Sequence, residues 1–350
     1  KENLLVLHEY RHAFKDSFLL VDSGYTKGYK KTDKLKKSKG SRSHFFAKYN
    51  RDLSKDDFSS NLEINFQQVN NDTYLKVHDI ETQLANKKDN IITKDINYEF
   101  QSDKNYLGIS AAMYENLTSN DSDKTRFEYS VPNILFERNL FTGDKTGVFD
   151  IKSNAFVKNS KVNQTTKFWI NDVNWQSNPF VSLNGIQNKF KGLFKIVNYE
   201  AEGAQKYKTE GLNSEVSGVL AYDAKLPMSK KNQDKNRINF FTPKLSFRYA
   251  PGHMRNIQDD DLKLSYSNAF LINKNAEPDV IEEGESIATG FDISSYELDE
   301  GLKADKNYSL SLAQIQSFKE NNSIPSKSSL DQNCLLYTSD AADEEDSVDL

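Results

Sequence analysis

Strict alternation of apolar and polar residues is the feature that most constrains how this chain can fold. Because successive side chains of a β-strand point to opposite faces, each alternating segment puts its apolar side chains on one face and its polar side chains on the other. About sixteen such segments follow one another, each close to the ~9–11 residues with which a tilted strand crosses a bilayer. The pattern therefore predicts an all-β chain. The clearest segments are 62–67, 96–101, 245–249, 262–266 and 308–312.

Clusters rich in Asn, Asp, Ser, Gly and Lys separate the alternating segments. This composition is typical of turns and surface loops, because these residues favour turn backbone conformations or bond to their own backbone. No shift in composition marks a second domain before residue 333, so we expect residues 1–333 to belong to one β domain. The clusters lie at 70–72, 86–90, 119–124, 142–146, 229–236 and 273–285.

The polar faces of these segments carry Ser, Asn, Gln, Glu, Lys and Arg, and only 37% of all residues are apolar, although there are 22 Phe and 17 Tyr. A soluble sandwich or propeller usually has shorter strands and an apolar inner face. A barrel in a membrane meets lipid with one face and water with the other, and its closure removes exposed strand edges. The sequence therefore favours an incomplete part of a large antiparallel transmembrane β-barrel. A soluble β-rich binding module remains the alternative.

Charge and hydropathy exclude other classes. The net charge of -5, from 46 basic and 51 acidic residues, argues against a dedicated nucleic-acid-binding protein. The longest clear apolar run, Leu4–Leu7, is far too short for a membrane helix. The chain starts at Lys1 without a charged and then apolar leader, so we expect a processed product or a fragment.

The end of the chain differs in character from the rest. Residues 334–344 resemble a translated sequencing-library adapter, and we expect 334–350 to be a non-native, disordered tail. An ordinary acidic tail is the alternative, and it predicts the same lack of structure. Cys334 is the only cysteine, so we expect neither a disulfide framework nor a thiolate metal site in the preceding part.

Four strings in fixed order sharpen this interpretation: 8–11 (HEYR), 66–75 (FQQVNNDTYL), 241–251 (FTPKLSFRYAP) and 307–315 (NYSLSLAQI). In this order and at these spacings they resemble the C-terminal barrel of the LPS-assembly protein LptD family, once called organic solvent tolerance protein. The resemblance covers most of residues 1–333. It implies a barrel at the large end of the single-chain range, in the outer membrane of a Gram-negative bacterium.

The resemblance also implies a function and partners. Members of this family insert lipopolysaccharide into the outer leaflet through a lumen and a lateral gate between the first and last strands. An LptE-type lipoprotein plugs the lumen, and a periplasmic Lpt bridge delivers lipopolysaccharide through a jelly roll. We expect the jelly roll and the final strands to be lacking here, so the gate is not assigned. A passive outer-membrane channel or another barrel transporter explains the alternation equally well, but not the ordered strings.

Physical gating, rather than bond chemistry, is the mechanism that we expect. A sugar-phosphate head cannot cross hydrocarbon cheaply, and acyl chains cannot cross a polar lumen cheaply, so a barrel that opens sideways accommodates both. If the apolar faces instead lined a packed interior, the hypothesis would be wrong. The polar residues expected to face the lumen are Asn65, Gln67, Asn97, Glu99 and Ser311.

We expect no enzyme activity and no catalytic, cofactor-binding or metal-binding residue, because no GxSxG, HExxH or phosphate-binding glycine loop occurs in the sequence. His8 and His12 would share a strand face but lie about 13 Å apart, too far for one metal ion. The carboxylate runs 259–261 and 282–283 are interpreted as solvated loop charge, with cation binding near lipopolysaccharide phosphates as the alternative. The lysine-rich segment 27–39 is likewise interpreted as a solvated loop, with phosphate contact as the alternative.

Overall fold

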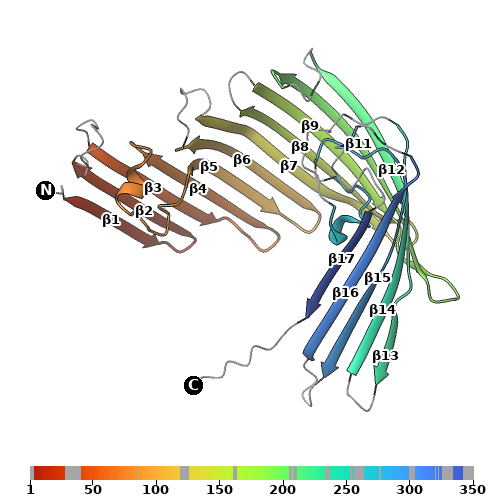
Figure 1. Cartoon of the computed structure of the whole chain (residues 1–350). Coiled ribbons are helices and arrows are strands. Elements are labelled where there is room, and N and C mark those ends of the chain that lie inside the picture. The colour runs from red at the N-terminus through yellow and green to blue at the C-terminus, as the bar shows by residue number, and fades with distance from the viewer. Residues whose placement is uncertain are drawn as a thin grey trace. The chain divides into compact units, whose positions relative to one another are not determined.

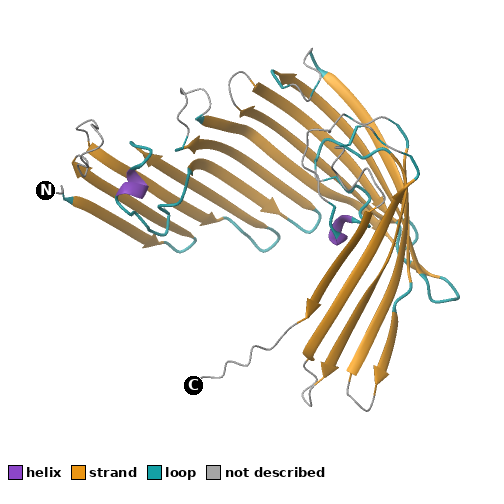
Figure 2. Cartoon of the chain, viewed as in Figure 1, coloured by secondary structure: helices purple, strands orange, loops and turns teal. Residues whose placement is uncertain are grey.

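The computed structural model describes most of the chain, and almost all of what it describes is β-structure (Figure 1). The helical parts among these residues are short: α1 (Tyr74–Val77) and the 3-10 turn η1 (Tyr266–Asn268) (Figure 2). The described residues are 4–27, 41–84, 86–118, 126–160, 164–204, 207, 211–232, 237–252, 255, 264–275, 277–298, 304–319, 321, 323–324 and 334–341.

Within these residues 17 strands are present. Most are long, up to 17 residues in β7. Their bounds are β1 (Leu5–Ala13), β2 (Ser17–Lys27), β3 (Ser41–Asp52), β4 (Ser59–Val69), β5 (Ile91–Gln101), β6 (Asn105–Asn116), β7 (Phe127–Gly143), β8 (Gly147–Ser160), β9 (Gln164–Gln176), β10 (Phe180–Val181), β11 (Gln187–Glu202), β12 (Asn213–Lys225), β13 (Met228–Asn232), β14 (Arg237–Ala250), β15 (Gly284–Leu298), β16 (Ala304–Ser317) and β17 (Cys334–Ala341).

The chain divides into two compact units, which we describe separately. Unit 1 comprises residues 1–138, 152–169 and 198–213. In it, strands β1 to β7 pair antiparallel in chain order, each with the next, as the red to yellow part of Figure 1 shows. The ladder between β2 and β3 is regular along its whole length, from Ser17↔Arg51 to Lys27↔Ser41. Neighbouring strands are therefore joined by local connections, as in an up-and-down sheet.

Unit 2 comprises residues 139–151, 170–197 and 214–350. Strands β14, β15, β16 and β17 pair antiparallel in chain order. Both β12 and β13 pair with β14, so they form successive parts of one strand interrupted at residues 226–227. Counting them as one strand brings the total close to the number expected from the alternation.

The predicted fold class is confirmed. The strands are antiparallel, long and nearly the only regular structure, and in neither unit do the described strands close into a barrel, as expected for an incomplete large barrel. No helix among the described residues is long and apolar enough to cross a membrane.

Two segments differ from expectation. The alternating run 262–266 does not form a strand where it is described: the Ser265 side chain caps η1 in a capping box with Asn268, and Leu264 is buried against the sheet. The tail from 334 was expected to be disordered, yet β17 pairs with β16, for example Leu312↔Tyr337. The stretch has strand-forming side chains, and Leu336 packs against a buried apolar cluster. Residues 342–350 lie outside the described part.

Candidate functional site

The sheet of unit 1 has two chemically different faces. The register places Asn65 opposite Asp95 and Glu63 opposite Asn97, so these residues point to one side, here called the polar face of unit 1. Gln67 lies two positions after Asn65 along β4, and Glu99 lies two positions after Asn97 along β5, so both lie on the same face. Asn65, Gln67, Asn97 and Glu99 therefore share one face of the sheet, and that this face lines a lumen stays a prediction.

The opposite side, here called the apolar face of unit 1, carries large hydrophobic side chains that remain exposed. Ile64 pairs directly with Ile96, and these side chains are 37% and 44% exposed. Phe45, Phe66 and Ile109 are exposed to a similar degree. Contiguous exposed apolar surface of this kind is unusual for a soluble protein and marks contact with a membrane or a partner.

Unit 2 repeats this division. Phe241 pairs with Ile293, and Ile293 pairs with Leu310 on the next strand, so that an exposed apolar face crosses β14, β15 and β16. The other side is the polar face of unit 2. The predicted Ser311 lies there opposite Asp292 and donates a hydrogen bond to its Oδ1 at 2.8 Å.

Hydrogen bonds link the polar side chains of unit 1 into a network. Asn65 donates from Nδ2 to Glu63 Oε1 at 2.9 Å and to Asp95 Oδ2 at 3.0 Å. Asn97 donates to the same Asp95 oxygen at 2.6 Å, and Lys48 Nζ forms an ion pair with Glu63 at 3.0 Å. The carboxylates of Glu63 and Asp95 thus have hydrogen-bond or ion-pair partners among the amides and the lysine, and the face still presents polar groups to water.

The β4–β5 loop (70–90) folds over the polar face of unit 1. Tyr74 and Leu75 of α1 are buried against Phe46 and Val69 of the sheet. The Tyr74 hydroxyl lies 3.3 Å from Nδ1 of the buried His44. Apolar burial therefore fixes this loop onto strands that otherwise present polar groups.

Charge and close packing add to this attachment. Nε2 of His44 lies 3.3 Å from Asp22 Oδ1, which is also buried. Arg126, before β7, bonds to Asp72 at 2.7 Å and through Nε to Glu115 at 2.9 Å. Gly24 leaves room for the arrangement, because a Cβ there would lie 2.5 Å from Cε1 of His44.

The β14–β15 loop (251–283) is attached to the polar face of unit 2 by cationic side chains from the strands. Arg248 donates from Nε to the backbone oxygen of Ile272 at 2.7 Å, and Lys195 donates to the backbone oxygen of Pro278 at 2.6 Å. Val280 and Ala269 of the loop are buried in an apolar cluster with the sheet. Charge-assisted bonds and apolar burial together hold the loop in place.

The sequence analysis did not predict that both loops lie on the polar faces, because their composition is that of ordinary turns. The correction is clearest at Glu282, which was interpreted as solvated: it is buried, and Nζ of Lys274 lies 3.9 Å from its Oε1. A buried charge requires a partner, which the sequence alone does not identify.

The remaining sequence candidates do not come together into a site. His8 and His12 lie on β1, where His12 packs edge-on against Phe14. Among the described residues, no group of three or more His, Cys, Asp or Glu side chains is placed to hold a metal ion. The acidic run 259–261 and the lysine-rich segment beyond Lys27, at 28–39, lie outside the described part.

Comparison with known proteins gives no match: no family model and no curated protein matches this chain. A functional proposal therefore rests on the sequence strings and the two-faced sheet.

Proposed function

We propose that this chain is part of an outer-membrane β-barrel of the lipopolysaccharide transport machinery, which inserts lipopolysaccharide into the outer leaflet. One observation carries the proposal. Long antiparallel strands present an exposed apolar face on one side and a hydrogen-bonded polar face on the other, as seen at Ile64–Ile96 and Asn65–Asp95. A sheet between lipid and water needs both faces.

The lengths of the connections support the membrane assignment. Outer-membrane barrels have short turns at one end and longer loops at the other. Because the strands of unit 1 are antiparallel, alternate connections lie at opposite ends of the sheet. The short connections are 14–16, 53–58 and 102–104, whereas the alternating ones are 28–40, 70–90 and 117–126.

The two faces also suit the proposed transport. A sugar-phosphate head follows the polar face, while acyl chains stay in the hydrocarbon that the apolar face meets, and no covalent bond changes. The β4–β5 and β14–β15 loops are fixed on the polar faces by buried groups, including Tyr74 and Arg248. This arrangement favours a restricted path over a wide pore. The passive channel remains the second candidate, because alternation alone fits it equally well.

Depletion of the full-length protein in its own cells tests this function. We expect loss of lipopolysaccharide from the cell surface, measured by surface labelling, before any loss of other outer-membrane barrels. Reconstitution in liposomes tests the channel: rapid flux of small solutes with unchanged surface lipopolysaccharide after depletion would favour the channel and contradict our proposal. Migration on a detergent gel before and after boiling separates either barrel from a soluble module.

A further inference from the structure

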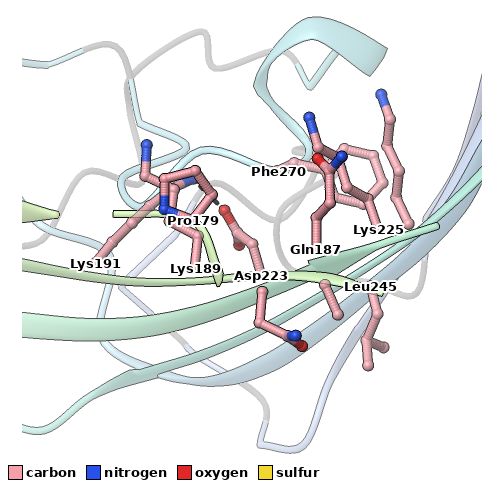
Figure 3. Close-up of a pocket in the computed structure, with 11 residues that line it drawn as sticks. Pro179, Gln187, Lys189, Lys191, Asp223, Lys225, Leu245 and Phe270 are labelled. Carbon is pink, nitrogen blue, oxygen red and sulfur yellow. Dashed lines mark ion pairs between the residues drawn. The ribbon is translucent and has the colours of Figure 1, made fainter. Parts of the chain in front are cut away.

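A cavity rich in lysine opens on the polar face of unit 2. Its volume is about 290 Å³, and it lies among β11, β12, β14 and the β14–β15 loop. Four lysines and a single carboxylate, Asp223, line it, together with the aromatic ring of Phe270 from the loop (Figure 3). The lysines are Lys189, Lys191, Lys225 and Lys244.

Two of these lysines are neutralised within the fold. Lys191 forms an ion pair with Asp223, which also accepts a hydrogen bond from Ser246 at 2.7 Å. Lys244 forms an ion pair with Asp292 and donates to the hydroxyl of Tyr266 at 3.1 Å. These pairs account for the carboxylates in and beside the cavity.

The other two lysines form no ion pair with a carboxylate among the described residues. Lys189 donates from Nζ to the neutral amide oxygen of Gln176 at 2.7 Å. Lys225 forms no hydrogen bond or ion pair through its side chain with any of the described residues. The register places Lys225 directly opposite Lys244 on β14, an arrangement of like charges that destabilises an antiparallel pair. Lys191 and Lys225 repel Lys189, while Asp223, which is paired with Lys191, attracts it. The cavity therefore has four lysines, of which two form ion pairs with carboxylates and two do not.

Beside the lysines and Asp223, the lining includes the amides of Gln187 and Asn188 and some apolar surface. Phe270 and Pro179 contribute carbon surface beside the ammonium groups. A phosphate accepts charge-assisted hydrogen bonds from ammonium groups, and the carbon face of a sugar ring packs against apolar surface. The volume is near the lower end of ligand sites, which start at about 300 Å³, and suits one phosphorylated sugar unit.

We infer that this cavity binds the phosphate of a phosphorylated sugar, with Lys189 and Lys225 as its principal ligands. The identity of that sugar as part of a lipopolysaccharide head rests on the proposed function, whereas affinity for a sugar phosphate is independent of it. Binding relieves the repulsion between Lys225 and Lys244 and gives Lys189 its missing anionic partner.

Calorimetric titration of the full-length protein in detergent micelles tests the inference, with glucosamine 1-phosphate and inorganic phosphate as probes. We expect saturable binding of glucosamine 1-phosphate and at least about tenfold weaker binding by the double variant Lys189→Gln, Lys225→Gln. Lys230→Gln makes the same kind of change at an exposed lysine of β13 outside the cavity, and we expect it to bind as the unchanged protein does. Lys225→Arg keeps the charge and should retain binding if the double variant folds poorly.

Absence of glucosamine 1-phosphate binding, or equal binding by the double variant, would overturn the inference. Equal affinity for inorganic phosphate would overturn its sugar component. The two proposals fail separately. If binding requires Lys189 and Lys225 but depletion leaves surface lipopolysaccharide intact, only the proposed function is refuted. If depletion removes surface lipopolysaccharide but binding does not require these lysines, only the inference about the cavity is refuted.

Discussion

Arg248 of β14 donates a hydrogen bond from Nε to the backbone oxygen of Ile272, at 2.7 Å. The guanidinium is buried, and a second nitrogen donates to the backbone oxygen of Glu282. One strand side chain therefore binds the β14–β15 loop at two points along its length. Removing it leaves the carbonyl groups of Glu282, in a buried contact, and of Ile272, in a partly buried one, without a charged donor. A buried carbonyl group left unsatisfied costs about 1–3 kcal/mol.

Substitution of Arg248 by Met is expected to release this loop. Lys274, in the same loop, is buried and donates to Ser286 Oγ at 2.9 Å, so trypsin should not reach it in the unchanged protein. We expect Arg248→Met to make the bond after Lys274 cleavable under native conditions, as mass spectrometry of the fragments would reveal. Arg51→Met changes an exposed arginine of β3 and should leave cleavage after Lys274 unchanged. Equal protection of Lys274 in both variants would contradict the proposed attachment.

Gly24 is expected to tolerate no side chain. A Cβ there would lie 2.5 Å from Cε1 of His44 and 2.6 Å from the Tyr74 hydroxyl, and both rings are buried. Gly24→Ala should therefore displace α1 and destabilise the fold by about 1–3 kcal/mol, the usual range for overpacking. The matched control is Gly218→Ala, where the nearest atom outside the local backbone is 3.7 Å from the new Cβ. Thermal unfolding in detergent should separate the two variants; equal midpoints would contradict the close packing.

Burial and the nearby Asp22 carboxylate raise the pKa of Tyr74 from 10.0 to about 12. The unfolded chain loses this proton near pH 10, whereas the folded chain keeps it to about pH 12. The protonated Tyr74 hydroxyl thus contributes on the order of 2 kcal/mol to the free energy of unfolding below pH 10, and this contribution is lost as the pH rises towards 12. Unfolding measured between pH 9 and pH 12 should show this decline, and Tyr74→Phe should reduce it. A parallel decline in the variant would show that Tyr74 does not cause it.

Most of the fold could be predicted from the alternation of apolar and polar residues. The period of two fixes which side chains share a face once strands pair in chain order. Asn65 and Asn97 could therefore be placed on one face from sequence. The positions of the β4–β5 and β14–β15 loops could not be predicted, because their attachment depends on partners distant in sequence, such as Arg248 with Ile272. The lysine cavity was missed for the same reason: only the pairing of β12 with β14 brings Lys225 opposite Lys244.

Ile96 distinguishes a membrane sheet from a soluble one. Its side chain is exposed on the apolar face, whereas the next residue, Asn97, lies on the polar face and donates to Asp95. If the apolar face meets lipid, Ile96→Lys should destabilise the folded barrel by about 2–4 kcal/mol near the bilayer midplane. Asn97→Lys places the same charge beside Asp95 and Glu63, where water and carboxylates accommodate it. We expect Ile96→Lys alone to reduce the heat-modifiable form in outer-membrane fractions. In a soluble β-module a lysine at exposed Ile96 would be harmless, so equal accumulation of both variants would contradict the membrane assignment.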